Sequence, residues 1–169
     1  MNKPSQVYQI KISLLDTEPL IWRRVQVPDH YDLSNLHRAI QSAMGWENSH
    51  LYEFVRCTRE SIPETYKVKE VLSLKNNKVY YEYDFGDGWV HEISLEKILP
   101  TSAGIKYPIC IAGEMACPPE DCGGIPGYYN ILEIIKNPKH REYSFTLDWL
   151  GKKFDPNRFD PKKVYFNKN

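Results

Sequence analysis

Alternating apolar residues on both sides of a glycine-containing loop constrain the fold of this chain more than any other feature. Residues 78–95 read KVYYEYDFGDGWVHEISL, with apolar side chains on every second position before and after the loop. Successive side chains of a strand point to opposite faces of a sheet. The segment therefore predicts a β-hairpin with one face in a hydrophobic core.

The length of the hairpin loop follows from the same alternation. A two-residue turn at Asp87 and Gly88 would mix apolar and acidic side chains on each face, whereas a three-residue loop over residues 86–88 keeps one face apolar. We therefore predict the longer loop. Its register pairs Phe85 with Trp89, Tyr83 with His91, Tyr81 with Ile93 and Val79 with Leu95.

This register decides on which face of the hairpin several titratable side chains lie. His91 falls on the apolar face, so we interpret it as a core histidine rather than as a general acid or base. On the other face Glu82 lies opposite Glu92, and like charges directly opposed in a sheet repel each other. We expect a cation between them. It is either an arginine of a neighbouring strand, Arg23 or Arg24, or a metal ion or shared proton.

The spacing of apolar residues also predicts the other elements. Strands are expected over residues 8–14, 20–27 and 51–57, and helices over residues 33–44, 128–137 and 142–150. Asp32 or Ser34 can cap the first helix at its N-terminus, and Gly45 can end it. A stretch rich in glycine, proline and cysteine separates the strands from the last two helices.

These elements predict an α+β fold. It consists of a mixed β-sheet with one amphipathic helix across a face, similar to a β-grasp core, and a helical C-terminal cap. We predict one domain over residues 1–169, with a β-rich core at about 6–99, a Cys/Pro/Gly-rich loop at 100–127 and the helical cap at 126–169. A chain of this length buries enough surface for one sizeable core.

The charge balance restricts the classes of partner. Lys and Arg number 22 and Asp and Glu also number 22, so no net field draws the molecule to nucleic acid or to an anionic membrane. A nucleic-acid partner would need a local patch. Residues 1–9 lack the apolar run of a signal peptide, and no stretch of about 18 apolar residues occurs. We expect a cytoplasmic protein with no membrane partner.

Three of the four cysteines raise the possibility of zinc. Cys110, Cys117 and Cys122 could supply three ligands, with His91 or His50 as the fourth. However, six and four residues intervene between the cysteines, whereas structural zinc sites usually take ligands in closely spaced pairs. The alternative is that the cysteines are small core residues or a redox-exposed thiol pair. No other cofactor is indicated.

Two loops carry paired acids that could act in catalysis. Asp84 and Asp87 belong to the hairpin loop, and Glu120 and Asp121 follow two prolines in the cysteine-rich stretch. Carboxylates on stiff loops can hold a divalent cation for phosphoester hydrolysis. This hypothesis requires the two loops to converge in space.

Other residues suggest binding without catalysis. Gly123 and Gly124 precede a helix, whose free N–H groups could bind an anion. The large side chains of Trp46, Trp89 and Tyr128, together with Arg24, could contact a protein or nucleic-acid partner. The structural alternative is that the glycines serve only the turn and that the aromatic residues pack in the core.

Several sequence blocks together resemble the plasmid pRiA4b ORF-3-like family. They are residues 21–25 (IWRRV), 36–40 (LHRAI), 45–46 (GW), 50–54 (HLYEF), 83–91 (YDFGDGWVH), 117–124 (CPPEDCGG) and 127–128 (GY). The resemblance extends from about residue 7 to 165. It implies a passenger protein of mobile elements with no established activity. Some members carry a resolvase-like name, but we find no serine or tyrosine recombinase signature in this sequence.

Two hypotheses about function remain. The first is a non-catalytic binding module for a protein or a nucleic acid, favoured by the balanced charge, the abundant aromatic residues and the absence of a nucleophile signature. The second is a metal-dependent hydrolase that uses the carboxylates of the two acidic loops. Whether the chain is an enzyme stays open at this point, and the oligomeric state is not indicated.

Overall fold

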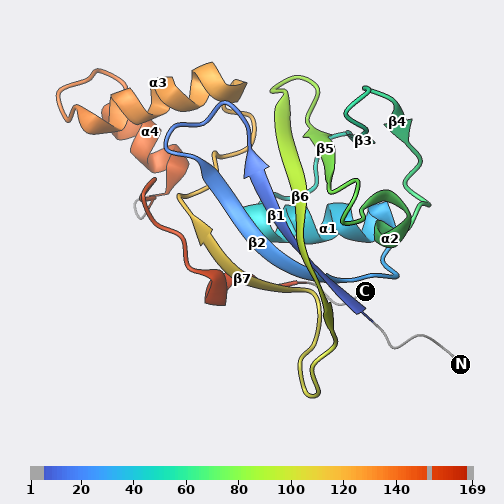
Figure 1. Ribbon diagram of the computed structural model, residues 1–169. Coiled ribbons are helices and arrows are strands. Elements are labelled where there is room, and N and C mark those ends of the chain that lie inside the picture. Colours follow the sequence, from blue (N-terminus) through green and yellow to red (C-terminus); the bar gives the residue numbers. More distant parts are fainter. Residues whose placement is uncertain (1–5, 152–153, 167–169) are drawn as a thin grey trace, which may run out of the picture.

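A single antiparallel β-sheet forms the centre of the protein in the computed structural model, which describes residues 6–151 and 154–166. Its seven strands in the described residues follow the order β4-β3-β5-β6-β1-β2-β7. The strands are β1 (Gln6–Leu14), β2 (Ile21–Pro28), β3 (Tyr52–Val55), β4 (Ser61–Ile62), β5 (Lys78–Tyr83), β6 (Trp89–Pro100) and β7 (Ile109–Glu114). Figure 1 shows the long strands β6, β1 and β2 side by side.

The α+β class and the helix across one face are confirmed. The sheet differs from the predicted mixed one, because each pairing between the described strands is antiparallel. Tight connections join β1 to β2 and β5 to β6, and such connections make neighbouring strands run in opposite directions. The remaining helical elements are α2 (Val68–Val71), α3 (Gly124–Lys136), α4 (Tyr143–Leu150) and the short 3₁₀ helix η1 (Pro161–Lys163).

Helix α1 (Leu33–Met44) covers one face of the sheet, behind β1, β2 and β6 in Figure 1. Its predicted caps are confirmed: the Asp32 carboxylate accepts a hydrogen bond from the N–H of Asn35 at 2.8 Å, and Gly45 has the left-handed φ of 87°. The helix buries the apolar stripe that its spacing predicted. The buried positions are Leu33, Leu36, Ala39, Ile40, Ala43 and Met44.

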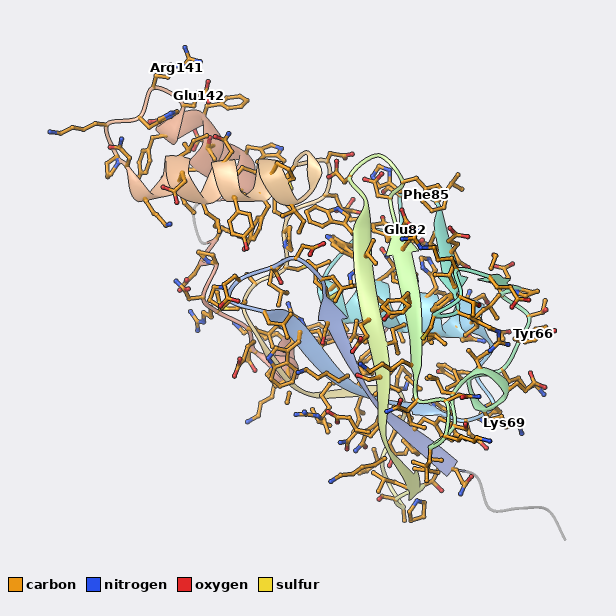
Figure 2. The ribbon with its side chains drawn as sticks, turned by 45° about the horizontal axis from the view of Figure 1, so that its top comes forward. Tyr66, Lys69, Glu82, Phe85, Arg141 and Glu142 are labelled. Atoms are coloured by element: carbon orange, nitrogen blue, oxygen red, sulfur yellow. The ribbon has the colours of Figure 1, made fainter. Side chains whose placement is uncertain are left out.

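The β5–β6 hairpin has the predicted faces but not the predicted register. Val79, Tyr81 and Tyr83 pair with Ile93, His91 and Trp89, so the strands are shifted by two residues and the loop runs over residues 84–88. The Asp84 carboxylate stabilises this wider loop, because its Oδ1 accepts a hydrogen bond from the N–H of Gly86 at 3.0 Å. Phe85 lies at the exposed tip (Figure 2) instead of opposite Trp89.

The shifted register also changes the acidic pairs. Glu92 lies opposite Tyr80 rather than Glu82, and its carboxylate binds the Lys78 ammonium at 2.9 Å. The predicted opposition of Glu82 and Glu92 is therefore wrong, and with it the arginine, metal ion or shared proton expected between them. Glu82 instead lies opposite Glu53 of β3.

The stretch at 100–127 contains more regular structure than predicted. Strand β7 forms within it and pairs with β2 at the sheet edge, with a register shift next to Arg24. The sequence of β7, ICIAGE, does not alternate between apolar and polar residues. The periodicity of the sequence therefore did not predict this strand. The two predicted C-terminal helices are confirmed as α3 and α4, which lie together beyond one end of the sheet (Figure 1). No helix in the described ranges is long and apolar enough to cross a bilayer.

Candidate functional site

The two acidic loops meet at one end of the sheet. The N–H of Gly123, which precedes α3, donates a hydrogen bond to Oδ2 of Asp87 in the β5–β6 loop at 3.2 Å. A Cβ atom on Gly124 would lie only 2.4 Å from the carbonyl oxygen of Asp87. The loops are thus in direct contact, as the hydrolase hypothesis requires.

Two of the four candidate acids accept hydrogen bonds from other segments of the chain. Asp87 accepts the N–H at the start of α3, so the protein's own carboxylate occupies the helix N-terminus where an external anion could have bound. Glu120 accepts the N–H of Glu47 at 2.9 Å and also the hydroxyl of Tyr83. Burial and the hydrogen bond to Glu120 both raise the pKa of Tyr83, so the phenol stays protonated and donates to Glu120.

The other two acids face a histidine. His50 Nε2 lies 3.3 Å from Oδ1 of Asp121 and 3.7 Å from Oδ2 of Asp84. One ligand atom from each of these residues lies within 4.8 Å of the other two. Sequence reasoning considered His50 only as a partner of the cysteines. The block HLYEF held no signal that it would meet both acidic loops, because the contact depends on how the loops fold.

The cysteines and His91 form no comparable group in the part of the chain that the structure describes. Burial raises the pKa of Cys110 and Cys117 above the usual range, and that of Cys122 to about 12. A zinc ion would have to displace the protons of these thiols, because a cysteine binds metal as a thiolate. His91 is fully buried in the core, and its Nδ1 lies 3.2 Å from the carbonyl oxygen of Tyr81.

The predicted binding residues separate into three groups. Trp89 and Tyr128 are buried at 0% and 3% exposure, so their side chains serve the core. Arg24 lies on the sheet face away from α1, where Glu96 binds it through Nε at 2.6 Å and Nη2 at 2.8 Å. Trp46 is also mostly buried and donates its indole N–H to the carbonyl of Pro118 at 2.9 Å, but one edge of it borders a groove.

This groove lies beside α1 and has a volume of about 630 Å³. We call it the α1 groove. Residues of α1 line it together with residues 106–108 and Phe166. Its lining residues are Tyr31, Asn35, Arg38, Ala39, Gln41, Ser42, Trp46, Glu47, Asn48, Lys106, Tyr107, Pro108 and Phe166.

The charges and rings of the α1 groove suit an anionic ligand with flat rings. Arg38 and Lys106 are cationic and exposed, and Glu47 is the single acid among the lining residues. Tyr31, Tyr107 and Phe166 add aromatic surface that is partly open to solvent. The groove is thus a local patch with two cations and one acid on a chain whose total charge is balanced.

The comparisons with known proteins cover nearly the whole chain. The sequence model of the plasmid pRiA4b ORF-3-like protein family matches residues 6–163. The uncharacterized protein y4hQ of Sinorhizobium fredii is 37% identical over 160 residues, which cover 87% of this chain and 82% of the relative. The crystal structure of MM3350, a protein of unknown function from Methanosarcina mazei Go1, is similar with a TM-score of 0.91 and 43% identity. That similarity covers 97% of this chain and 100% of the other.

Proposed function

The chain belongs to the plasmid pRiA4b ORF-3-like family, and from this premise we propose that it is a non-catalytic binding module for single-stranded nucleic acid. The α1 groove carries this proposal. Proteins that bind single strands combine a positively charged groove with aromatic rings on which bases stack. The volume of about 630 Å³ suits a ligand of one to a few nucleotides.

Individual groups of the α1 groove match parts of such a ligand. Arg38 and Lys106 can bind phosphates, and each contact releases a counterion from the strand. The rings of Tyr31 and Tyr107 can stack on bases, which is worth about 1–3 kcal/mol for each base. An acidic peptide would use the two cations but would leave the aromatic rings without partners, so the nucleic acid is the better match.

Fluorescence anisotropy with labelled single strands of DNA and RNA tests this function. The double variant Arg38→Glu/Lys106→Glu should bind at least about 10-fold more weakly than the wild type, because two phosphate contacts become repulsive. The slope of log K against log salt should become shallower by about 1.4, since each phosphate contact to a single strand contributes about 0.7.

The matched control is Lys69→Glu/Lys139→Glu, which makes the same charge change at exposed positions outside the α1 groove. It should bind like the wild type apart from a small long-range effect. Equal losses in the two double variants would contradict the proposal, as would binding of an acidic peptide in preference to the oligonucleotide.

A metal-dependent hydrolase of phosphoesters is the second candidate. The contact of both acidic loops with His50 favours it, because a cation held by two carboxylates and an imidazole could lower the pKa of a bound water. Turnover of a phosphodiester that depends on a divalent cation and on Asp84 would support the hydrolase over the non-catalytic module.

A further inference from the structure

Three segments far apart in the sequence direct potential metal ligands into one volume. His50 precedes β3, Asp84 follows β5, and Asp121 lies in the loop before α3. Among the described residues these three form the group of His, Cys, Asp and Glu side chains whose ligand atoms lie within 4.8 Å of one another. The group differs from a surface cluster of acids, since one of its three ligand atoms is an imidazole nitrogen.

The two distances from His50 match the shell of a small metal ion better than they match a hydrogen-bonded ion pair. Two ligand atoms about 2.1 Å from a tetrahedral zinc ion lie about 3.4 Å apart. His50 Nε2 is 3.3 Å and 3.7 Å from the nearest oxygens of Asp121 and Asp84. A charged N–H···O⁻ bond would be about 2.7–2.9 Å long. Neither contact has hydrogen-bond geometry, and His50 Nε2 is a buried atom without a hydrogen-bond partner among the described residues.

Asp84 is held in place with one oxygen left free. Its side chain is 10% exposed, and Oδ1 accepts the N–H of Gly86 at 3.0 Å. Oδ2 points toward His50 and accepts no hydrogen bond from a described residue. His50 Nε2 is buried without a partner, which costs free energy, whereas Asp84 Oδ2 is not among such buried atoms. A cation in the shared volume would give a partner to both His50 Nε2 and Asp84 Oδ2.

We propose that His50, Asp84 and Asp121 bind one zinc ion. One imidazole and two carboxylates are ligands that zinc accepts, whereas magnesium and calcium prefer oxygen ligands alone. The side chain of Asp121 is 74% exposed, so the ion can enter from solvent and the fourth position stays open to water or to a ligand oxygen. The site is independent of the α1 groove, and either proposal can fail without the other.

Isothermal titration calorimetry with zinc tests the site, with protein purified without chelator or affinity metal. The wild type should bind one equivalent at micromolar concentration or tighter. His50→Gln and Asp84→Asn should each weaken binding at least about 10- to 100-fold, the loss already known for residues that only support a metal ligand. Asparagine at position 84 keeps the acceptor for the N–H of Gly86, so the loop keeps its shape. Thermal melts of the metal-free proteins check that each variant folds.

Two controls separate this site from other ways of binding zinc. His30 and Asp29 form a surface pair 3.6 Å apart without a third ligand, so Asp29→Asn/His30→Gln should leave zinc binding unchanged. Cys110→Ala/Cys122→Ala should also bind zinc like the wild type. Less than one equivalent of zinc in the wild type overturns the proposal. So does undiminished binding in His50→Gln, or loss of zinc in the cysteine variant alone.

Discussion

Arg23 and Arg24 are neighbours in β2 with opposite environments. The Arg23 guanidinium is buried at 1% exposure and donates to the carbonyls of Ala43 at 3.0 Å and Glu114 at 2.8 Å. The ring of Phe159 lies 3.7 Å from its central carbon. Burial lowers the pKa of Arg23, yet an arginine stays protonated in proteins. Carbonyl dipoles and an aromatic face, rather than a carboxylate of the described residues, therefore stabilise this charge.

We predict that Arg23→Ala costs at least about 3 kcal/mol of unfolding free energy, because it leaves buried carbonyls without donors and opens a cavity. Arg24→Ala should cost at most about 1 kcal/mol, since its ion pair with Glu96 is partly exposed to solvent. Urea denaturation followed by circular dichroism measures both values. Equal costs for the two variants would show that the carbonyl contacts of Arg23 contribute little.

At the scale of elements, the β5–β6 loop and the N-terminus of α3 form one structural unit. Asp87 of the loop accepts the N–H of Gly123, as a capping residue would, although it lies 36 residues earlier in the chain. Gly124 lets the two backbones approach because it has no side chain. We infer that this contact between the loops helps to place Asp121 beside His50.

We predict that Gly124→Ala is much more destabilising than Gly104→Ala. Both glycines have positive φ, of 66° and 80°, so alanine is strained at either position by about 1 kcal/mol. A Cβ on Gly124 would also lie 2.4 Å from a backbone oxygen, whereas no described atom lies within 4 Å of a Cβ on Gly104. The clash should add at least about 2 kcal/mol.

Chemical denaturation of the two alanine variants measures this difference, and zinc titration of Gly124→Ala shows whether the acidic loops have separated. A similar cost at both positions would mean that the loop backbone moves aside freely. In that case the contact between the β5–β6 loop and α3 does not hold Asp121 in place.

At the scale of the whole molecule, neutral histidines in the core couple stability to pH. Burial lowers the pKa of His91 from 6.5 to about 4, and burial also lowers the pKa of His37. The unfolded chain therefore takes up protons below about pH 6.5 that the folded protein does not bind. The contribution of these neutral rings to the unfolding free energy is fully present above pH 6.5 and is lost as the pH falls toward 4.

We predict that the proton uptake linked to His91 alone makes the unfolding free energy about 2 kcal/mol smaller at pH 5 than at pH 7.5. Urea denaturation at both pH values should show this extra loss in the wild type relative to His91→Leu, in which the proton site is absent. NMR titration of the wild type gives a second measurement, since the His91 ring should stay neutral at pH 5. A ring that protonates near pH 6.5 would contradict the prediction.

The sequence by itself determined most of the long strands and helices and the faces that they bury, but not β7 or the short elements β4 and α2. Alternation, helical spacing and caps such as Asp32 and Gly45 are properties of neighbouring residues in the chain. They can therefore be recognised without knowledge of the tertiary structure. The α+β class and the family resemblance rest on the same local patterns. Strand β7 was not predicted, because its residues do not alternate and because it is stabilised by pairing with β2.

Only the tertiary structure decided the register of the hairpin and the composition of the candidate sites. A shift of two residues keeps every side chain on its face, so alternation cannot distinguish the predicted register from the observed one. The group of His50, Asp84 and Asp121 depends on packing between loops that lie 34 or more residues apart. The α1 groove likewise needs a helix, residues 106–108 and Phe166 in one place. Contacts of this kind follow from the packing of elements, which no local pattern encodes.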